Sequence, residues 1–336
     1  MINRIVHSFV ASITTIFLLM SCSQADEEAR NKALDRMTYT INPSIPLIGP
    51  VFRDQGSEVE KSKYVSSLVA LIVKEAHQKA LKYLEAGDTQ AYYTFLTLAL
   101  TVPLHEGLYV HFRNVDGDVC NVAANNSELI KNSGQETWKI FNQYFKNPTR
   151  TYFPNCEAMA NRKGVKQMIR GGDGTDLSIM QISIRWHFDD FLANKKYESV
   201  SKTLNYGFKH LLSGFDPVYR NVSDYKCLME PGFFFRKKKI NYINLIKGVW
   251  AGKYNSGSNS QTCRFNDPNS AFKNHDIQFA KNLDKILNFS GTISSDIVGN
   301  LRLSNETSLA VKEIISNLKN NKNERSSLDK LLALSL

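Results

Sequence analysis

The sequence is poor in the residues that mark several common kinds of site. Its 336 residues include five cysteines, no two of which form the Cys-x-x-Cys pair of a zinc finger or ribbon. His105 and Glu106 begin a His-Glu pair, but Tyr109 stands where a zinc peptidase carries its second histidine. No Ser-His-Asp or Cys-His arrangement, EF-hand spacing, nucleic-acid motif or internal repeat is recognisable. We therefore expect no metal, no cofactor and no nucleic-acid partner.

Long apolar runs are also scarce, and the run near the amino terminus is interpreted as an export signal. Phe9–Met20 follows Arg4 and is shorter than the roughly 20 residues that cross a bilayer. Residues 19–22 read Leu-Met-Ser-Cys, which resembles a bacterial lipobox. The resemblance implies cleavage before Cys22 and its acylation, and Ser23 favours an outer-membrane position facing the periplasm. The alternative is an ordinary cleaved signal and a secreted protein.

Behind an export signal, the four remaining cysteines predict two disulfides formed in an oxidising compartment. Four cysteines allow three connectivities. We expect Cys120–Cys156 and Cys227–Cys263, because each bond then closes one inserted loop.

The formal net charge of +10 is ordinary for many proteins of this size, and it also suits attraction to an anionic polymer or membrane surface.

Apolar spacing predicts a mainly α protein whose long loops leave room for a small β-hairpin. Residues 61–86 repeat apolar side chains at three and four positions, and residues 90–104 are apolar enough for a buried helix. Pro103 is expected to perturb the last turn of the second helix. Further helices are expected at 184–194, 197–212, 240–254, 270–288, 307–318 and 325–334. The expected parts are a signal peptide at 1–21, a tether and extended lead-in at 22–60, one main domain at 61–290 and a helical extension at 291–336.

Three segments carry the candidate chemistry. Glu106 ends the most apolar helix, where burial raises the pKa of a carboxyl group and keeps its proton near neutral pH. Such an acid can protonate the leaving oxygen of a glycoside, while a second carboxylate holds the attacking water. Residues 171–176 form a Gly-Asp loop in which glycine allows a close approach to a polymer, and residues 253–257 read Lys-Tyr-Asn-Ser-Gly. Taken alone, these residues also fit a helix end and simple turns.

Together the segments resemble goose-type lysozymes and soluble lytic transglycosylases. Residues 178–182 (Ser-Ile-Met-Gln-Ile) are similar to the Gly-Leu-Met-Gln-Ile motif of that family, and residues 253–257 to its Ala-Tyr-Asn-Ala-Gly motif. Gly172-Asp173, His187 and His275-Asp276 are similar to goose-type features. The resemblance covers residues 90–285 and implies a lysozyme-like domain that cleaves peptidoglycan between N-acetylmuramic acid and N-acetylglucosamine.

The resemblance also implies a role for each matching residue. Glu106 would be the general acid, and Asp173 would help to hold the attacking water. Gln181 would line the sugar subsites, while Tyr254 and Asn255 would shape the cleft beside the acid. The expected substrate-binding set is completed by Met180, Ile182 and His187. Tryptophans are more often core residues, but Trp186 follows the Met-Gln segment and is the candidate for a sugar contact.

Departures from the family leave several alternatives open. Ser178 replaces the first glycine of the motif, Ser183 replaces an aspartate, and Gly107 follows the glutamate where transglycosylases usually have serine. The Gly-Asp loop is one residue shorter, so either Asp173 or Asp176 matches the family aspartate.

Two chemistries therefore compete. A lysozyme needs a held water, whereas a lytic transglycosylase needs only the glutamate, because the C6 hydroxyl of the sugar attacks and leaves a 1,6-anhydro end. We expect inverting hydrolysis, with transglycosylation as one alternative and an inactive peptidoglycan-binding lipoprotein as another. The expected partners are peptidoglycan and, through the lipid anchor, the membrane, with the protein itself a monomer.

Overall fold

The fold is mainly helical, as the sequence predicts, with small two-stranded antiparallel sheets. The computed structural model describes residues 58–107, 109, 112–115, 165–168, 176–183, 186, 187, 190, 191, 194, 196, 200–230, 239–295 and 299–334. The predicted lipidation site Cys22, the predicted disulfide partners Cys120 and Cys156, and the predicted catalytic Asp173 lie outside these ranges. The expected helix at 184–194 is described only in part, so it stays a prediction.

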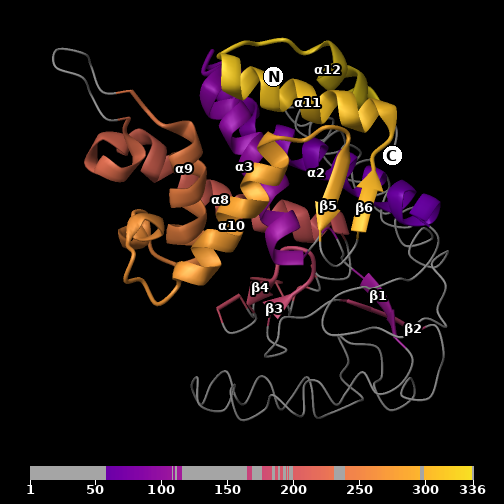
Figure 1. Ribbon diagram of the computed structural model, residues 1–336, viewed down its shortest axis with the longest axis horizontal. Coiled ribbons are helices and arrows are strands. Elements are labelled where there is room, and N and C mark those ends of the chain that lie inside the picture. Colours follow the sequence, from indigo (N-terminus) through magenta and orange to yellow (C-terminus); the bar gives the residue numbers. More distant parts are fainter. Residues whose placement is uncertain are drawn as a thin grey trace, which may run out of the picture.

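Two consecutive helices form the centre of the molecule (Figure 1). α2 spans Glu58–Glu85 and α3 spans Thr89–Gly107. α3 is apolar on all sides because α2, α8, α9, α10 and α11 all pack against it. Pro103 lies inside α3, which continues beyond the predicted end at residue 104. A proline removes one backbone donor, and the surrounding helices hold the next turn in place.

Three further helices surround α3 on the side of the candidate site. They are α8 (Val200–Arg220), α9 (Tyr242–Val249) and α10 (Lys273–Leu287). α9 runs directly into a π-helical turn, η5, at Trp250–Tyr254. Such turns widen a helix by one residue and occur frequently at functional sites. Short 3-10 turns lie at Val222–Asp224, Lys226–Leu228, Asn259–Gln261 and Arg264–Asn266.

The C-terminal region shares the core of the main domain. β5 (Thr292–Ser295) and β6 (Gly299–Arg302) form an antiparallel pair, and α11 (Asn305–Asn320) and α12 (Ser326–Ala333) follow. Figure 1 shows α11 and α12 lying together, and both contact α2. Leu301, Ile314 and Leu328 are fully buried with the apolar residues of α2 and α3. The predicted extension at 291–336 therefore packs on the same core over its described residues.

None of the three strand pairs among the described residues was predicted at its position: β5 and β6 lie within the expected helical extension at 291–336, and the other two pairs precede it. β1 (Phe112–Val115) pairs with β2 (Val165–Met168), and β3 (Asp176–Leu177) pairs with β4 (Ile182–Ser183). The second pair forms a tight hairpin, with Ser178 at a φ of +68° and Gln181 at +45°. This hairpin lies at the end of α3.

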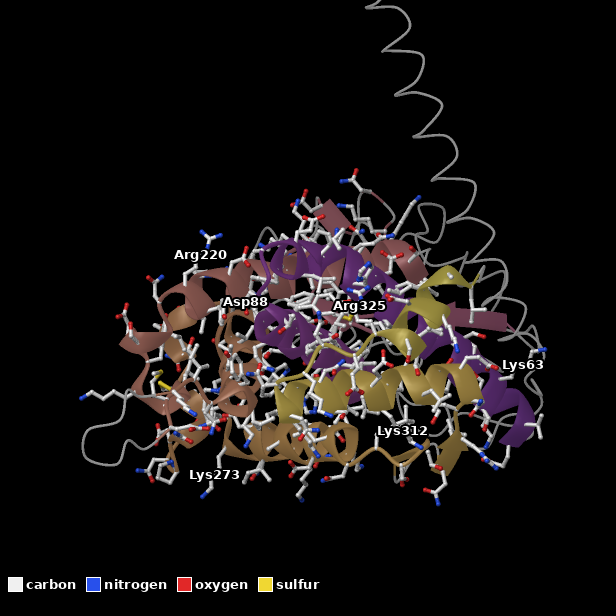
Figure 2. The ribbon with its side chains drawn as sticks, turned by 90° about the horizontal axis from the view of Figure 1, so that it is seen from above. Lys63, Asp88, Arg220, Lys273, Lys312 and Arg325 are labelled. Atoms are coloured by element: carbon white, nitrogen blue, oxygen red, sulfur yellow. A yellow bond between two sulfur atoms is a disulfide. The ribbon has the colours of Figure 1, made fainter. Side chains whose placement is uncertain are left out.

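The predicted disulfide between Cys227 and Cys263 is confirmed, with the two Cα atoms 5.7 Å apart. Among the described residues, no helix is both long and apolar enough to cross a bilayer. Of the basic side chains labelled in Figure 2, Lys63 of α2, Arg220 of α8, Lys273 of α10 and Lys312 of α11 are exposed, and Arg325 is half-buried and paired with Asp329. Positive charge is thus spread around this part of the chain.

Candidate functional site

A cavity of about 580 Å³ lies where the end of α3, the β3–β4 hairpin, α8 and the π-helical turn meet. It brings together residues from all three segments singled out in the sequence. Its lining residues are Glu106, Asp176, Gln181, Ile182, Ser183, Trp186, His187, His210, Lys253, Tyr254, Asn255, Ser256 and Gly257. Six residues predicted to belong to the site are therefore neighbours in space: Glu106, Gln181, Ile182, His187, Tyr254 and Asn255.

Glu106 lies in the wall of this cavity, half-buried at the last turn of α3. Its Oε1 accepts a hydrogen bond of 2.9 Å from the indole Nε1 of Trp250. Burial raises the pKa of the Glu106 carboxyl to about 7, the hydrogen bond from Trp250 opposes the rise, and the charge of Asp176 adds to it. The carboxyl group can therefore hold its proton near neutral pH and still reach the cavity.

Trp250 is itself held in place by two neighbouring side chains. Its ring stacks on Phe279 at 4.3 Å between centroids, and the guanidinium of Arg264 lies 5.7 Å from its ring centre. Arg264 is fixed by Asp276, with Nε–Oδ2 at 3.1 Å and Nη2–Oδ1 at 2.6 Å, and both side chains are buried. Asp276 thus acts at a distance, by orienting Arg264 against the indole that contacts Glu106.

The hydrogen bond from Trp250 to Glu106 leads to a prediction for the pH dependence of activity. The Trp250→Phe variant loses a hydrogen bond to the ionised form of Glu106, so its carboxyl pKa should rise further above about 7. If Glu106 acts as an acid, activity falls as pH rises through this pKa, and the variant should lose activity at a higher pH than the wild type. The measurement is the alkaline limb of kcat/KM against pH. A limb that stays in place or moves to lower pH would contradict this reading.

The end of α3 touches the hairpin so closely that residue 107 has to be glycine. A Cβ atom on Gly107 would lie 2.5 Å from the carbonyl oxygen of Ile179 and 2.6 Å from its Cα. The hydroxyl of Tyr254 donates to the carbonyl oxygen of Met180, which joins the π-helical turn to the same hairpin. These two contacts set Gln181 and Ile182 beside Glu106.

Met180 differs from the other predicted site residues. Its side chain is fully buried and packs against Gly207 of α8, where an added Cβ would lie 2.5 Å from the Met180 Cε. It is absent from the lining of the cavity. Its contribution to the site is the backbone carbonyl oxygen that accepts the hydrogen bond from Tyr254.

Two histidines form one wall of the cavity. His187 Nδ1 lies 2.8 Å from the hydroxyl of Tyr206, and the rings of His187 and His210 meet edge to face at 4.9 Å. Burial lowers the pKa of both imidazoles, that of His210 to about 4, and each is lowered further by the charge of Lys253. His210 is therefore uncharged at neutral pH.

The second carboxylate among the described lining residues is Asp176, which the sequence analysis kept as the alternative to Asp173. Asp173 lies outside the described residues. The sequence analysis did not assign Trp250 or His210 to the site. Trp250 lies four positions before Tyr254, a spacing that could have suggested a shared face. His210 on α8 carried no recognisable signal.

The cavity therefore combines a carboxyl group of raised pKa, a second carboxylate and several amides and hydroxyls. Within the described part of the chain, no group of three or more histidine, cysteine, aspartate or glutamate side chains is arranged to hold a metal ion. Comparisons of the chain with models of protein families, with curated proteins and with solved structures found no match.

Proposed function

We propose that this protein cleaves the glycan strands of peptidoglycan between N-acetylmuramic acid and N-acetylglucosamine, with Glu106 as the general acid. The observation that carries the proposal is a glutamate whose pKa is raised to about 7, set in the wall of a cavity of about 580 Å³ with a second carboxylate. A protonated carboxyl group can deliver its proton to the glycosidic oxygen as the bond breaks.

The remaining lining residues fit a sugar substrate. The side chains of Gln181 and Asn255 offer amide groups for hydroxyl and acetamido groups of the glycan. Trp186 is 81% exposed, so its ring face is open to stack on a sugar. The lipobox at Cys22 is consistent with a position next to the cell wall, and export and acylation are part of the proposal.

Hydrolysis with inversion is the favoured reaction because Asp176 provides a carboxylate for the attacking water. Asp176 lines the same cavity as Glu106, and its negative charge raises the pKa of the Glu106 carboxyl. Ser183, which pairs with Asp176 across the hairpin, supplies a hydroxyl where goose-type enzymes have an aspartate. This departure supports the second candidate, a lytic transglycosylase, which requires no held water.

The Asp176→Asn variant separates these two reactions. If the water is held by Asp176, the variant should lose activity by about 10²-fold or more, because general base catalysis contributes on that scale. The measurement is the rate of product release from purified peptidoglycan, with mass spectrometry of the glycan ends. Reducing ends from the wild type support hydrolysis, whereas 1,6-anhydro ends with an active Asp176→Asn variant support transglycosylation. A wild-type protein that releases neither product overturns the proposed enzyme and leaves the binding-protein alternative.

A further inference from the structure

We propose that Lys253 recognises a carboxylate group of the substrate and so selects an acidic glycan over a neutral one. The inference rests on the proposed function and deepens it by naming the chemical class of the substrate. Among the described residues that line the cavity, Lys253 is the one lysine or arginine, and the other polar groups are carboxylates, imidazoles, amides, hydroxyls and an indole. The motif that residues 253–257 resemble has alanine at this position, so the charge is a property of this chain.

The side chain of Lys253 is positioned by its packing against α8. A Cβ atom on Gly214 would lie 2.5 Å from the Lys253 Cβ and 2.9 Å from its Cγ, so the glycine makes room for the lysine stem. The ammonium group lies 3.4 Å from the carbonyl oxygen of Gly257, at the far side of the turn that lines the cavity. Because the aliphatic part of the Lys253 side chain is already packed, it loses less conformational entropy on binding a ligand than a surface lysine would.

Lys253 has no carboxylate partner within the described part of the chain. Within that part of the chain its ammonium group makes one hydrogen bond, to the carbonyl oxygen of Gly257, and neither Glu106 nor Asp176 forms an ion pair with it. His210 is neutral at physiological pH and cannot take over the cationic role. The ammonium charge is thus available to a ligand that enters the cavity.

The chemistry of the glycan supplies the matching anion. N-acetylmuramic acid carries a lactyl carboxyl group that N-acetylglucosamine lacks. In a strand without peptides this group is a free carboxylate, and in a peptide-bearing strand it is an amide followed by peptide carboxylates. An ammonium point charge binds either kind of carboxylate, and a charge-assisted hydrogen bond of this type is among the stronger ones in proteins.

The test compares binding of three oligosaccharides by calorimetry in the Glu106→Gln background, which slows turnover by the factor that general acid catalysis contributes. The probes are chitotetraose, a peptide-free muramyl tetrasaccharide and the same tetrasaccharide with stem peptides. Lys253→Met should weaken binding of a muramyl probe by about 10- to 100-fold and leave chitotetraose unchanged. Lys253→Arg should restore most of the affinity. The control Lys209→Met removes a charge from α8 outside the cavity and should change none of the three.

The outcomes distinguish the inference from the proposed function. If Lys253→Met loses affinity only for the peptide-free tetrasaccharide, Lys253 binds the lactyl carboxylate. If it loses affinity only for the peptide-bearing tetrasaccharide, Lys253 binds a carboxylate of the stem peptide. An equal loss for chitotetraose, or no loss for any probe, overturns the role of Lys253 while the proposed function stands. A background protein that binds none of the three overturns both.

Discussion

Replacing Glu106 by glutamine is expected to lower kcat for the proposed glycan cleavage by about 10²- to 10⁴-fold, the range that general acid catalysis contributes. Glutamine keeps the size of the side chain and can still accept the hydrogen bond from Trp250. It cannot transfer a proton. The measurement is the initial rate of product release from purified peptidoglycan, and an unchanged rate would remove Glu106 from the reaction.

The same variant should be more stable than the wild type at alkaline pH. In the unfolded chain the Glu106 carboxyl ionises near its ordinary pKa of 4.5, and in the fold near 7. Between these values the unfolded state loses its proton first, so the folded state loses stability as pH rises from 4.5 to 7, and the loss is constant above 7. At 1.36 kcal/mol per pKa unit the full loss is about 3 kcal/mol, which Glu106→Gln should recover.

The stability measurement has an internal control. Chemical denaturation should show a higher free energy of unfolding for Glu106→Gln than for the wild type at pH 8, and little difference between the two at pH 4. Asp284→Asn changes an exposed carboxylate on α10 and should give no comparable gain at pH 8. If Glu106→Gln is inactive but no more stable than the wild type at pH 8, the Glu106 carboxyl does not have the buried environment described above.

The helices could be predicted because each is indicated by the spacing of apolar residues within its own segment. The seven expected helices that can be compared are present, since each buries a stripe of apolar residues whose spacing is visible in the chain. Glu106 was predictable for the same reason, because it lies in the last turn of a helix that is apolar on every side. The strands β3 and β4 are two residues long, which is too short for an alternating pattern to appear.

The fine structure of the site depends on contacts between distant segments, so the sequence could not supply it. Trp250 reaches Glu106 from a π-helical turn 144 positions away, and no local pattern predicts that meeting. Ser178 was noted as a departure from a glycine, and its φ of +68° explains why glycine suits that position. Its hydroxyl is also buried without a hydrogen-bond partner among the described residues. Packing of the hairpin against its neighbours therefore has to offset the free-energy cost of this unsatisfied hydroxyl.

Gly107→Ala is expected to destabilise the fold by about 3 kcal/mol and to lower kcat. The new methyl group would lie 2.5 to 2.8 Å from three backbone atoms of Ile179, and backbone cannot move aside as a flexible side chain can. The hairpin and α3 must then separate, which displaces Gln181 from the side of Glu106. Displacements of about 1 Å in a catalytic arrangement can lower rates about 10²-fold. Thermal denaturation and the rate of peptidoglycan cleavage measure the two effects.

Gly87→Ala is the matched control for this substitution. Gly87 has a φ of +75° but nothing within 4 Å of an added Cβ, so alanine there meets backbone strain of about 1 kcal/mol and no clash. It lies in the turn between α2 and α3, at the opposite end of α3 from Glu106, and cleavage should proceed at the wild-type rate. If Gly107→Ala is no less stable than Gly87→Ala and cleaves equally well, then α3 does not meet the hairpin closely, and Gln181 has no fixed place beside the acid.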